Sequence, residues 1–134
     1  MQNNEKQWLW QKAIGTSWHG HEFLATVEEI ENVFGEPDVV GEKEDKVQFE
    51  WILDLEISNS LGTSAVITIY DWKEYRNYHN DEFIRFHIGG HSSNITELAK
   101  SLAIAAATIL AVTLTYGVTV IIVTVISGNY FLAI

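Results

Sequence analysis

Apolar and polar side chains alternate along residues 47–57, which gives this chain its clearest pattern. The apolar residues occupy every second position: Val47, Phe49, Trp51, Leu53, Leu55 and Ile57. Polar residues fill the positions between them, with Ile52 as the exception. A period of two indicates a strand with one buried face. Further strands are predicted over 65–72 and 82–88, with a turn at 58–62, and their short links indicate an antiparallel meander.

A helix signal precedes this meander. Thr26 and Glu29 have the spacing of a capping box, and Gly35 is placed to end a short helix over 26–34. Residues 7–14 fit a strand or a helix equally. These patterns predict an α+β fold, in which a small antiparallel sheet with short helices is followed by a long hydrophobic C-terminal helix.

The C-terminal segment has a different composition from the rest of the chain. Residues 101–134 contain no Asp, Glu, Lys or Arg, and this run exceeds the roughly 20 residues that cross a bilayer as a helix. Asn94 and Glu97 have capping-box spacing, so a helix is expected to begin at Asn94 and continue into this segment. The chain is therefore divided into an acidic soluble head, 1–100, and a hydrophobic tail, 101–134.

Two structures are open for the tail. It is a transmembrane helix, or it is an element buried in an oligomer, because Val, Ile and Thr dominate 108–126 and also suit strands. In the second case Tyr116-Gly117 marks a bend and 127–129 a turn. The Ala-rich stretch 103–107 favours close approach of helices and a homo-oligomer. A membrane-spanning tail with Lys100 at its flank predicts a cytoplasmic head anchored to the inner membrane.

Charge narrows the possible partners. The net charge of −10 argues against a nucleic acid polymer, because such binding depends on clustered Lys and Arg. The absence of cysteine excludes a disulfide framework and thiolate metal sites. No recognisable catalytic constellation occurs, so no enzyme activity and no cofactor are predicted.

A candidate ligand site lies where the third strand meets the following helix. Gly89, Gly90, His91 and Ser92 are expected to form a turn whose N–H groups bind an anion. Three further residues complete this pocket in the prediction: Trp72, Lys73 and Arg85. The structural alternative is a strand-to-helix turn with a serine cap.

Two other groups of residues carry weaker signals. The histidine pairs His19/His21 and His87/His91 have types that bind zinc, but not a common helical spacing, so no metal site is predicted. Aromatic residues also gather beside cations between positions 70 and 86. Core packing is expected for Trp51, Trp72 and Phe86, whereas Tyr75, Arg76 and Tyr78 are expected on a loop that contacts a partner.

The segments Phe34-Gly35-Glu36-Pro37, Lys46-Val47, Glu50-Trp51, Ile69-Tyr70-Asp71-Trp72-Lys73 and Phe86-His87-Ile88-Gly89-Gly90 resemble a pattern in small phage-encoded proteins. These proteins are close to the phage inhibitors of Thoeris defence, which sequester cyclic ADP-ribose signals. The resemblance covers about 26–100 and does not include the tail. It implies a non-enzymatic nucleotide-binding protein, built as an oligomer, that holds its ligand between protomers with an aromatic ring and an arginine.

Two functions follow as expectations. The first is a small-ligand-binding protein that sequesters an anionic nucleotide signal, with Trp72, Lys73, Arg85 and the Gly89-to-Ser92 turn as its site. The second is a tail-anchored membrane protein that acts by self-assembly or through a protein partner, with a structural head. A metal-dependent hydrolase that uses the histidines is a third, weaker option.

Overall fold

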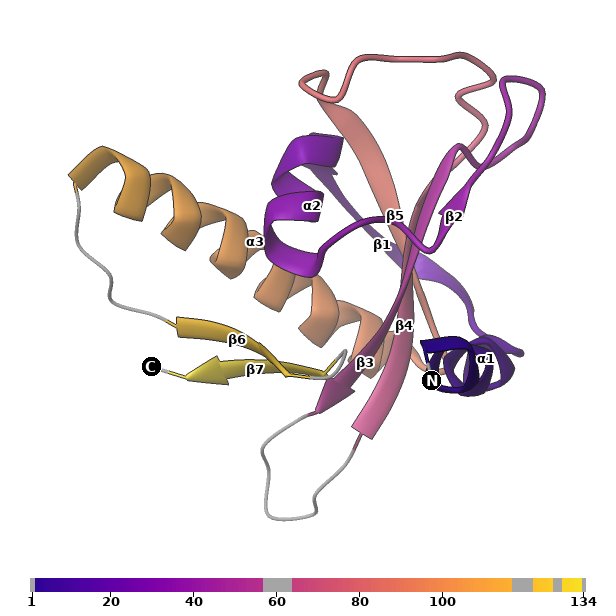
Figure 1. The fold of residues 1–134 in the computed structure, drawn as a ribbon, viewed down its shortest axis with the longest axis horizontal. Helices are drawn as coiled ribbons and strands as arrows, with labels where there is room; N and C mark the ends of the chain where they lie inside the picture. The colour runs from indigo at the N-terminus through magenta and orange to yellow at the C-terminus, as the bar shows by residue number, and fades with distance from the viewer. Residues whose placement is uncertain (1, 57–63, 117–121, 127–128, 134) are drawn as a thin grey trace.

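The computed structural model describes residues 2–56, 64–116, 122–126 and 129–133, and it has an α+β fold (Figure 1). The elements follow one another as α1 (Gln2–Ala13), β1 (Ser17–Ala25), α2 (Val27–Phe34), β2 (Val39–Val40), β3 (Phe49–Glu56), β4 (Ser64–Asp71), β5 (Ile84–Gly90), α3 (Ser93–Tyr116), β6 (Ile122–Ile126) and β7 (Asn129–Ala133). Residues 7–14, which fit either a strand or a helix from sequence, belong to α1 as far as Ala13.

The sheet has the strand order β1-β5-β4-β3-β7-β6, and β2 pairs with β3. The predicted meander is confirmed, because β3, β4 and β5 pair consecutively in antiparallel fashion. β1 adds an antiparallel strand beside β5 that the sequence pattern did not indicate. β7 pairs with β3 in parallel. The predicted turn at 58–62 lies outside the described residues.

The helices lie on both sides of the sheet. α2 and α3 cover one face, and α1 lies against the other (Figure 1). The predicted capping box of α2 is confirmed: the Thr26 hydroxyl accepts from the Glu29 N–H at 3.0 Å, and the Glu29 carboxylate accepts from the Thr26 N–H at 3.0 Å. These two bonds fix the start of the helix at the end of β1.

The start of α3 differs from the prediction. The helix begins at Ser93, and the Ser92 hydroxyl accepts from the Ile95 N–H at 3.3 Å, so the capping residue is Ser92 rather than Asn94. The physical reason is the length of β5. This strand continues through Gly89 and Gly90, which leaves only His91 and Ser92 to connect it to the helix.

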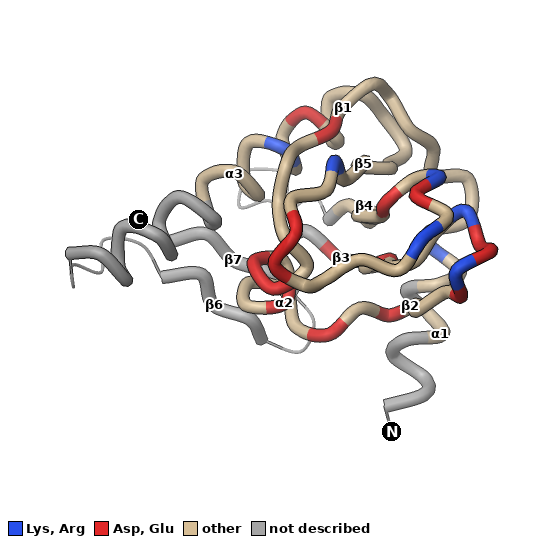
Figure 2. Tube along the Cα trace, turned by 90° about the horizontal axis from the view of Figure 1, so that it is seen from above, with Lys and Arg blue, Asp and Glu red and all other residues tan. Residues whose placement is uncertain are grey.

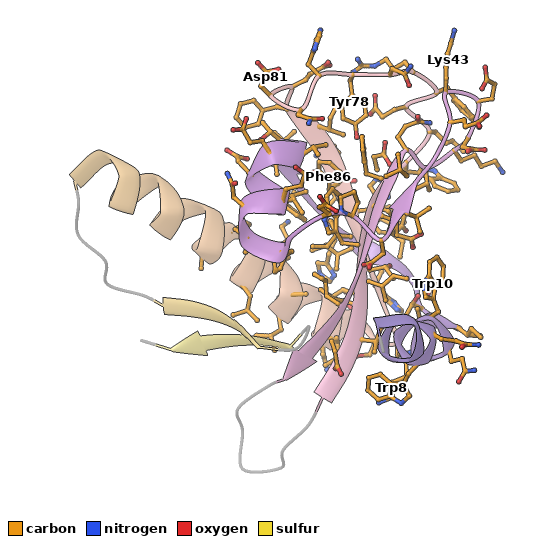
Figure 3. All side chains as sticks on the ribbon, in the orientation of Figure 1. Trp8, Trp10, Lys43, Tyr78, Asp81 and Phe86 are labelled. Atoms are coloured by element: carbon orange, nitrogen blue, oxygen red, sulfur yellow. The ribbon has the colours of Figure 1, made fainter. Side chains whose placement is uncertain are left out.

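The core fills the space between the sheet and helices α2 and α3. Trp51 and Phe86 are fully buried there and form a T-shaped pair with ring centroids 5.9 Å apart. Figure 3 shows Phe86 on this side of the sheet, between the strands and α2. The core positions predicted for Trp51 and Phe86 are confirmed. The core position predicted for Trp72 is wrong, because this residue comes directly after the end of β4 and 42% of its surface is exposed.

The tail residues take part in more than one element. α3 extends through 101–116, and β6 and β7 pair as an antiparallel hairpin. The long hydrophobic C-terminal helix is not confirmed, since none of the helices in the described ranges has both the length and the apolar character of a membrane span. Strands after a bend were the alternative expectation, but Gly117 and the turn residues Ser127 and Gly128 lie outside the described residues.

Candidate ligand pocket on the open face of the sheet

A hollow of about 250 Å³ lies on the face of the sheet opposite α2 and α3. Its lining comes from the segment after α1, from the residues around β3 and β4, and from β5: Thr16, Ser17, Val47, Glu50, Thr68, Tyr70, Trp72 and Gly89. We call this hollow the open-face pocket.

Strand register brings the central lining residues together. Tyr70 in β4 stands opposite Glu50 in β3 and opposite His87 in β5. Thr68, two residues earlier on the same face, stands opposite Gly89. Side chains two apart on a strand share a face, so one register places all of these groups on the side away from the core.

Gly89 leaves the space that forms part of this pocket. A Cβ atom at Gly89 would lie 2.5 Å from Thr68 Oγ1 and 3.5 Å from Tyr70 Cε1. Gly90 faces the other way, where a Cβ would lie 2.8 Å from Thr96 Cγ2 on α3. The predicted Gly-Gly turn is therefore wrong, because both glycines belong to β5 and each allows a close approach on a different face of the sheet.

Aromatic rings continue along the open face. The rings of Tyr70 and Trp72 form a T-shaped pair with centroids 6.3 Å apart. Beyond Tyr70, His87 lies 5.7 Å away and stacks on Trp18 at 5.2 Å. His87 Nε2 lies 3.1 Å from a carboxylate oxygen of Glu22, which holds the imidazole in place. This row of rings offers flat surfaces on which a planar ligand can stack.

Two lysines flank Trp72. The Nζ atoms of Lys73 and Lys46 lie 5.5 Å and 6.0 Å from the centroid of its ring. The Lys73 N–H donates to the Lys46 carbonyl oxygen at 2.7 Å, and this hydrogen bond connects the segment before β3 to the segment after β4. Lys73 itself has a φ of 58°. Neither ammonium group has an ion-pair partner in the part of the chain that the structure describes. Figure 2 shows Lys and Arg residues gathered on the side of the molecule where β2 lies.

Glu50 gives the pocket an acidic group. Its half-buried carboxylate makes no hydrogen bond or ion pair within the described ranges. Burial raises the pKa of Glu50, and the nearby Asp38 raises it further. Burial also raises the pKa of Tyr70, and the negative charge of Glu50 adds to this effect. The pocket therefore combines an acceptor inside with cations at its edge.

The histidines bind separate partners. His19 Nε2 is hydrogen-bonded to the Gly90 carbonyl oxygen at 3.0 Å, and His21 Nδ1 to the Thr96 hydroxyl at 2.7 Å. His91 Nε2 is bonded to the Lys12 carbonyl oxygen at 2.8 Å, which attaches the end of α1 to the end of β5. Among the described residues, no group of three His, Cys, Asp or Glu side chains has an arrangement that suits a metal ion.

The predicted site residues separate into three groups. Trp72 and Gly89 line the open-face pocket, and Lys73 lies beside Trp72. Arg85 lies on the same face of β5 as His87, but its guanidinium is 3.5 Å from Glu22 and its side chain is 60% exposed. The other three do not join the pocket lining: Gly90 faces α3, His91 contacts α1 and Ser92 caps α3.

Sequence reasoning missed several lining residues. Glu50 stood out as a polar position between buried ones and as part of a segment that carries the resemblance, but not as a site residue, and Thr16, Ser17 and Thr68 carried no signal. Knowledge that Glu50 and Tyr70 are cross-strand neighbours would have identified the pocket. Strand register depends on residues far apart in the chain, so the local sequence pattern did not reveal it. Comparison with known proteins adds no further evidence, because no family model, curated protein or solved structure shows a significant match to this chain.

Proposed function

We propose that this protein is a non-enzymatic small-ligand-binding protein that holds a nucleotide in the open-face pocket. The observation that carries the proposal is the position of Trp72, which lines the pocket and has the ammonium groups of Lys46 and Lys73 near its ring, neither with an ion-pair partner among the described residues. Aromatic side chains stack on bases, and ammonium groups bind phosphate as point charges. A base and a phosphate joined in one molecule fit this arrangement better than either alone.

The size of the pocket supports a ligand whose ring lies inside the pocket and whose phosphate groups lie outside it. A volume of about 250 Å³ is slightly below the roughly 300–1,000 Å³ that is usual for ligand pockets. Such a hollow accommodates one ring system. The phosphate groups would then remain at the edge, within reach of Lys46 and Lys73, where water also solvates them.

The resemblance to phage sponge proteins is consistent with this location. Two of the segments that carry it, 69–73 and 86–90, contribute Tyr70, Trp72 and Gly89 to the pocket lining. Sequestration of a cyclic nucleotide immune signal is therefore the biological role we propose. This role needs tight binding of a ligand that the protein does not alter chemically.

The test is direct binding to the full-length protein. Isothermal titration with a panel of mononucleotides, cyclic dinucleotides and cyclic ADP-ribose is expected to identify at least one ligand that is recovered unchanged after the protein is denatured. Trp72→Ala is expected to reduce the affinity about 10-fold or more, given the usual contribution of base stacking.

Trp8→Ala is the matched control. Trp8 is 46% exposed, close to the 42% of Trp72, and it also has a lysine on its ring, with Lys12 Nζ 3.7 Å from the centroid. It lies on α1 and does not line the pocket (Figure 3). The proposal fails if no nucleotide binds, or if the two variants lose affinity equally.

A second candidate function rests on the tail. Residues 101–134 lack charged side chains, and α3 runs into this segment from the head. We propose as the alternative that this segment carries a membrane or self-assembly function. Carbonate extraction and light scattering of the full-length protein distinguish these cases: an integral tail stays with membranes, whereas an assembly element gives a soluble oligomer of defined mass.

A further inference from the structure

Glu50 is the acidic residue among the eight that line the open-face pocket. An ionised carboxylate only accepts hydrogen bonds, and it has two oxygens side by side. In the described part of the chain, no N–H, hydroxyl or ammonium group pairs with these oxygens. These oxygens remain in contact with solvent, so a ligand that supplies two donors replaces water at this point with charge-assisted hydrogen bonds.

The surroundings of Glu50 determine which donors fit. Tyr70 stands directly opposite Glu50 across the strand pair, and its ring is perpendicular to that of Trp72. Burial has already removed part of the water from Glu50, as its raised pKa indicates. Because the two rings are nearly perpendicular, a flat ligand ring stacks on only one of them, and we take it to stack on Trp72 with its edge toward the carboxylate. The complementary edge therefore has two adjacent N–H donors.

Resting on the proposed function, we infer that Glu50 selects the base, and that the pocket takes a guanine nucleotide in preference to an adenine nucleotide. Guanine presents its ring N–H and its exocyclic amino group on one edge, and both can donate to a single carboxylate. Adenine has an unprotonated ring nitrogen beside its amino group, and the lone pair of this nitrogen faces the carboxylate. Sites that hydrogen-bond a donor reject analogues that lack it.

The experiment compares GMP, IMP and AMP by isothermal titration with the full-length protein at neutral pH. IMP keeps the ring N–H and lacks the amino group. Its comparison with GMP therefore tests the amino group, and its comparison with AMP tests the ring N–H. The expected order of affinity is GMP, then IMP, then AMP, with about 10- to 100-fold between the first and the last. Glu50→Gln is expected to reduce GMP affinity by a similar factor and to raise AMP affinity, because the amide presents a donor to the adenine ring nitrogen as well as an acceptor for its amino group.

Asp54→Asn is the matched control. Asp54 lies on the same face of β3, four residues from Glu50, and does not line the pocket. This variant is expected to bind GMP like the wild type, and thermal denaturation of both variants checks that they are folded. Equal binding of GMP and AMP, or GMP binding that Glu50→Gln does not change, overturns the inference while the proposed function stands. If no nucleotide in the wider panel binds, both fail.

Discussion

The two faces of the sheet use the same strands for different purposes. On the face covered by α2 and α3, alternate residues of β3, β4 and β5 are large, apolar and fully or almost fully buried: Trp51, Leu53, Ile69, Phe86 and Ile88. On the other face the residues between them are mixed: Ile52, Asp54, Val66 and Thr68 are buried, whereas Glu50, Tyr70 and His87 are polar or aromatic and partly exposed. The first face carries the main core, and the part of the second face around Glu50, Tyr70 and His87 is open to a ligand.

The contrast between the two faces shows which residues of the sheet are available for ligand binding. A buried face must be filled with apolar groups at close packing, so its residues are constrained by their neighbours. Around the open-face pocket this constraint is weaker, and the side chains of Glu50, Tyr70 and Trp72 gather there with no hydrogen bond to any other residue that the structure describes. Polar groups that folding does not use are candidates for binding.

The largest expected effect comes from the covered face. Phe86→Ala is expected to reduce the free energy of unfolding by about 4 kcal/mol, because a buried phenyl ring is lost and a cavity remains. Trp72→Ala, on the open side, is expected to cost about 1 kcal/mol or less. Urea denaturation measures both. Similar losses for the two variants would show that the open face also holds the fold together.

A buried carboxylate on the covered face gives the next effect. Asp71 is fully buried and accepts from the backbone N–H groups of Gln48 and Phe49 at 2.8 and 3.0 Å, and from the Tyr78 hydroxyl at 3.1 Å. Asp71→Asn is expected to lower the free energy of unfolding by about 2–3 kcal/mol, because one carboxylate oxygen becomes an amide NH2 group, which donates hydrogen bonds and cannot accept them. Exposed Asp81 provides the control, and urea denaturation of Asp81→Asn should show little change.

The adjacent glycines test the two faces directly. Gly89→Ala and Gly90→Ala are each expected to cost about 1–3 kcal/mol, because the new methyl groups overlap Thr68 and Thr96 respectively. Only Gly89→Ala is expected to reduce nucleotide affinity, since only Gly89 lines the pocket. Thermal denaturation and titration separate the two readouts. Adding Thr68→Ala to Gly89→Ala should restore stability, and failure to do so would place the strain elsewhere.

The smallest expected effect concerns pH. Burial raises the pKa of Glu50 above its ordinary value of 4.5, so ionisation of this group disfavours the folded state. This penalty is absent below the pKa of the unfolded chain and grows as the pH rises through the pKa of the folded protein. Glu50→Gln is therefore expected to raise stability by about 0.5 kcal/mol at neutral pH, because water still screens a half-buried group.

The same variant should give no gain at a pH below the ordinary value for a glutamate. Urea denaturation of the wild type and Glu50→Gln across this range measures the difference. A gain that stays constant at every pH would mean that charge is not its cause.

Local signals in the sequence predicted the parts of the fold that depend on near neighbours. The alternation over 47–57 identified β3, which the structure describes from Phe49 to Glu56, and its buried face. The Thr26-Glu29 capping box identified α2. Both signals are complete within one element. β1 escaped prediction because its pairing with β5 shifts register between Trp18 and Glu22, so only its second half alternates between buried and exposed positions.

The sequence by itself therefore determined the α+β class, the antiparallel meander and the core positions of Trp51 and Phe86, because hydrophobic period and capping act over a few residues. Only the tertiary structure decided that Gly89 and Gly90 belong to a strand, that Trp72 lies outside the core, and that Glu50 faces Tyr70. These outcomes depend on strand register and on the placement of α1, and residues far apart in the chain fix both.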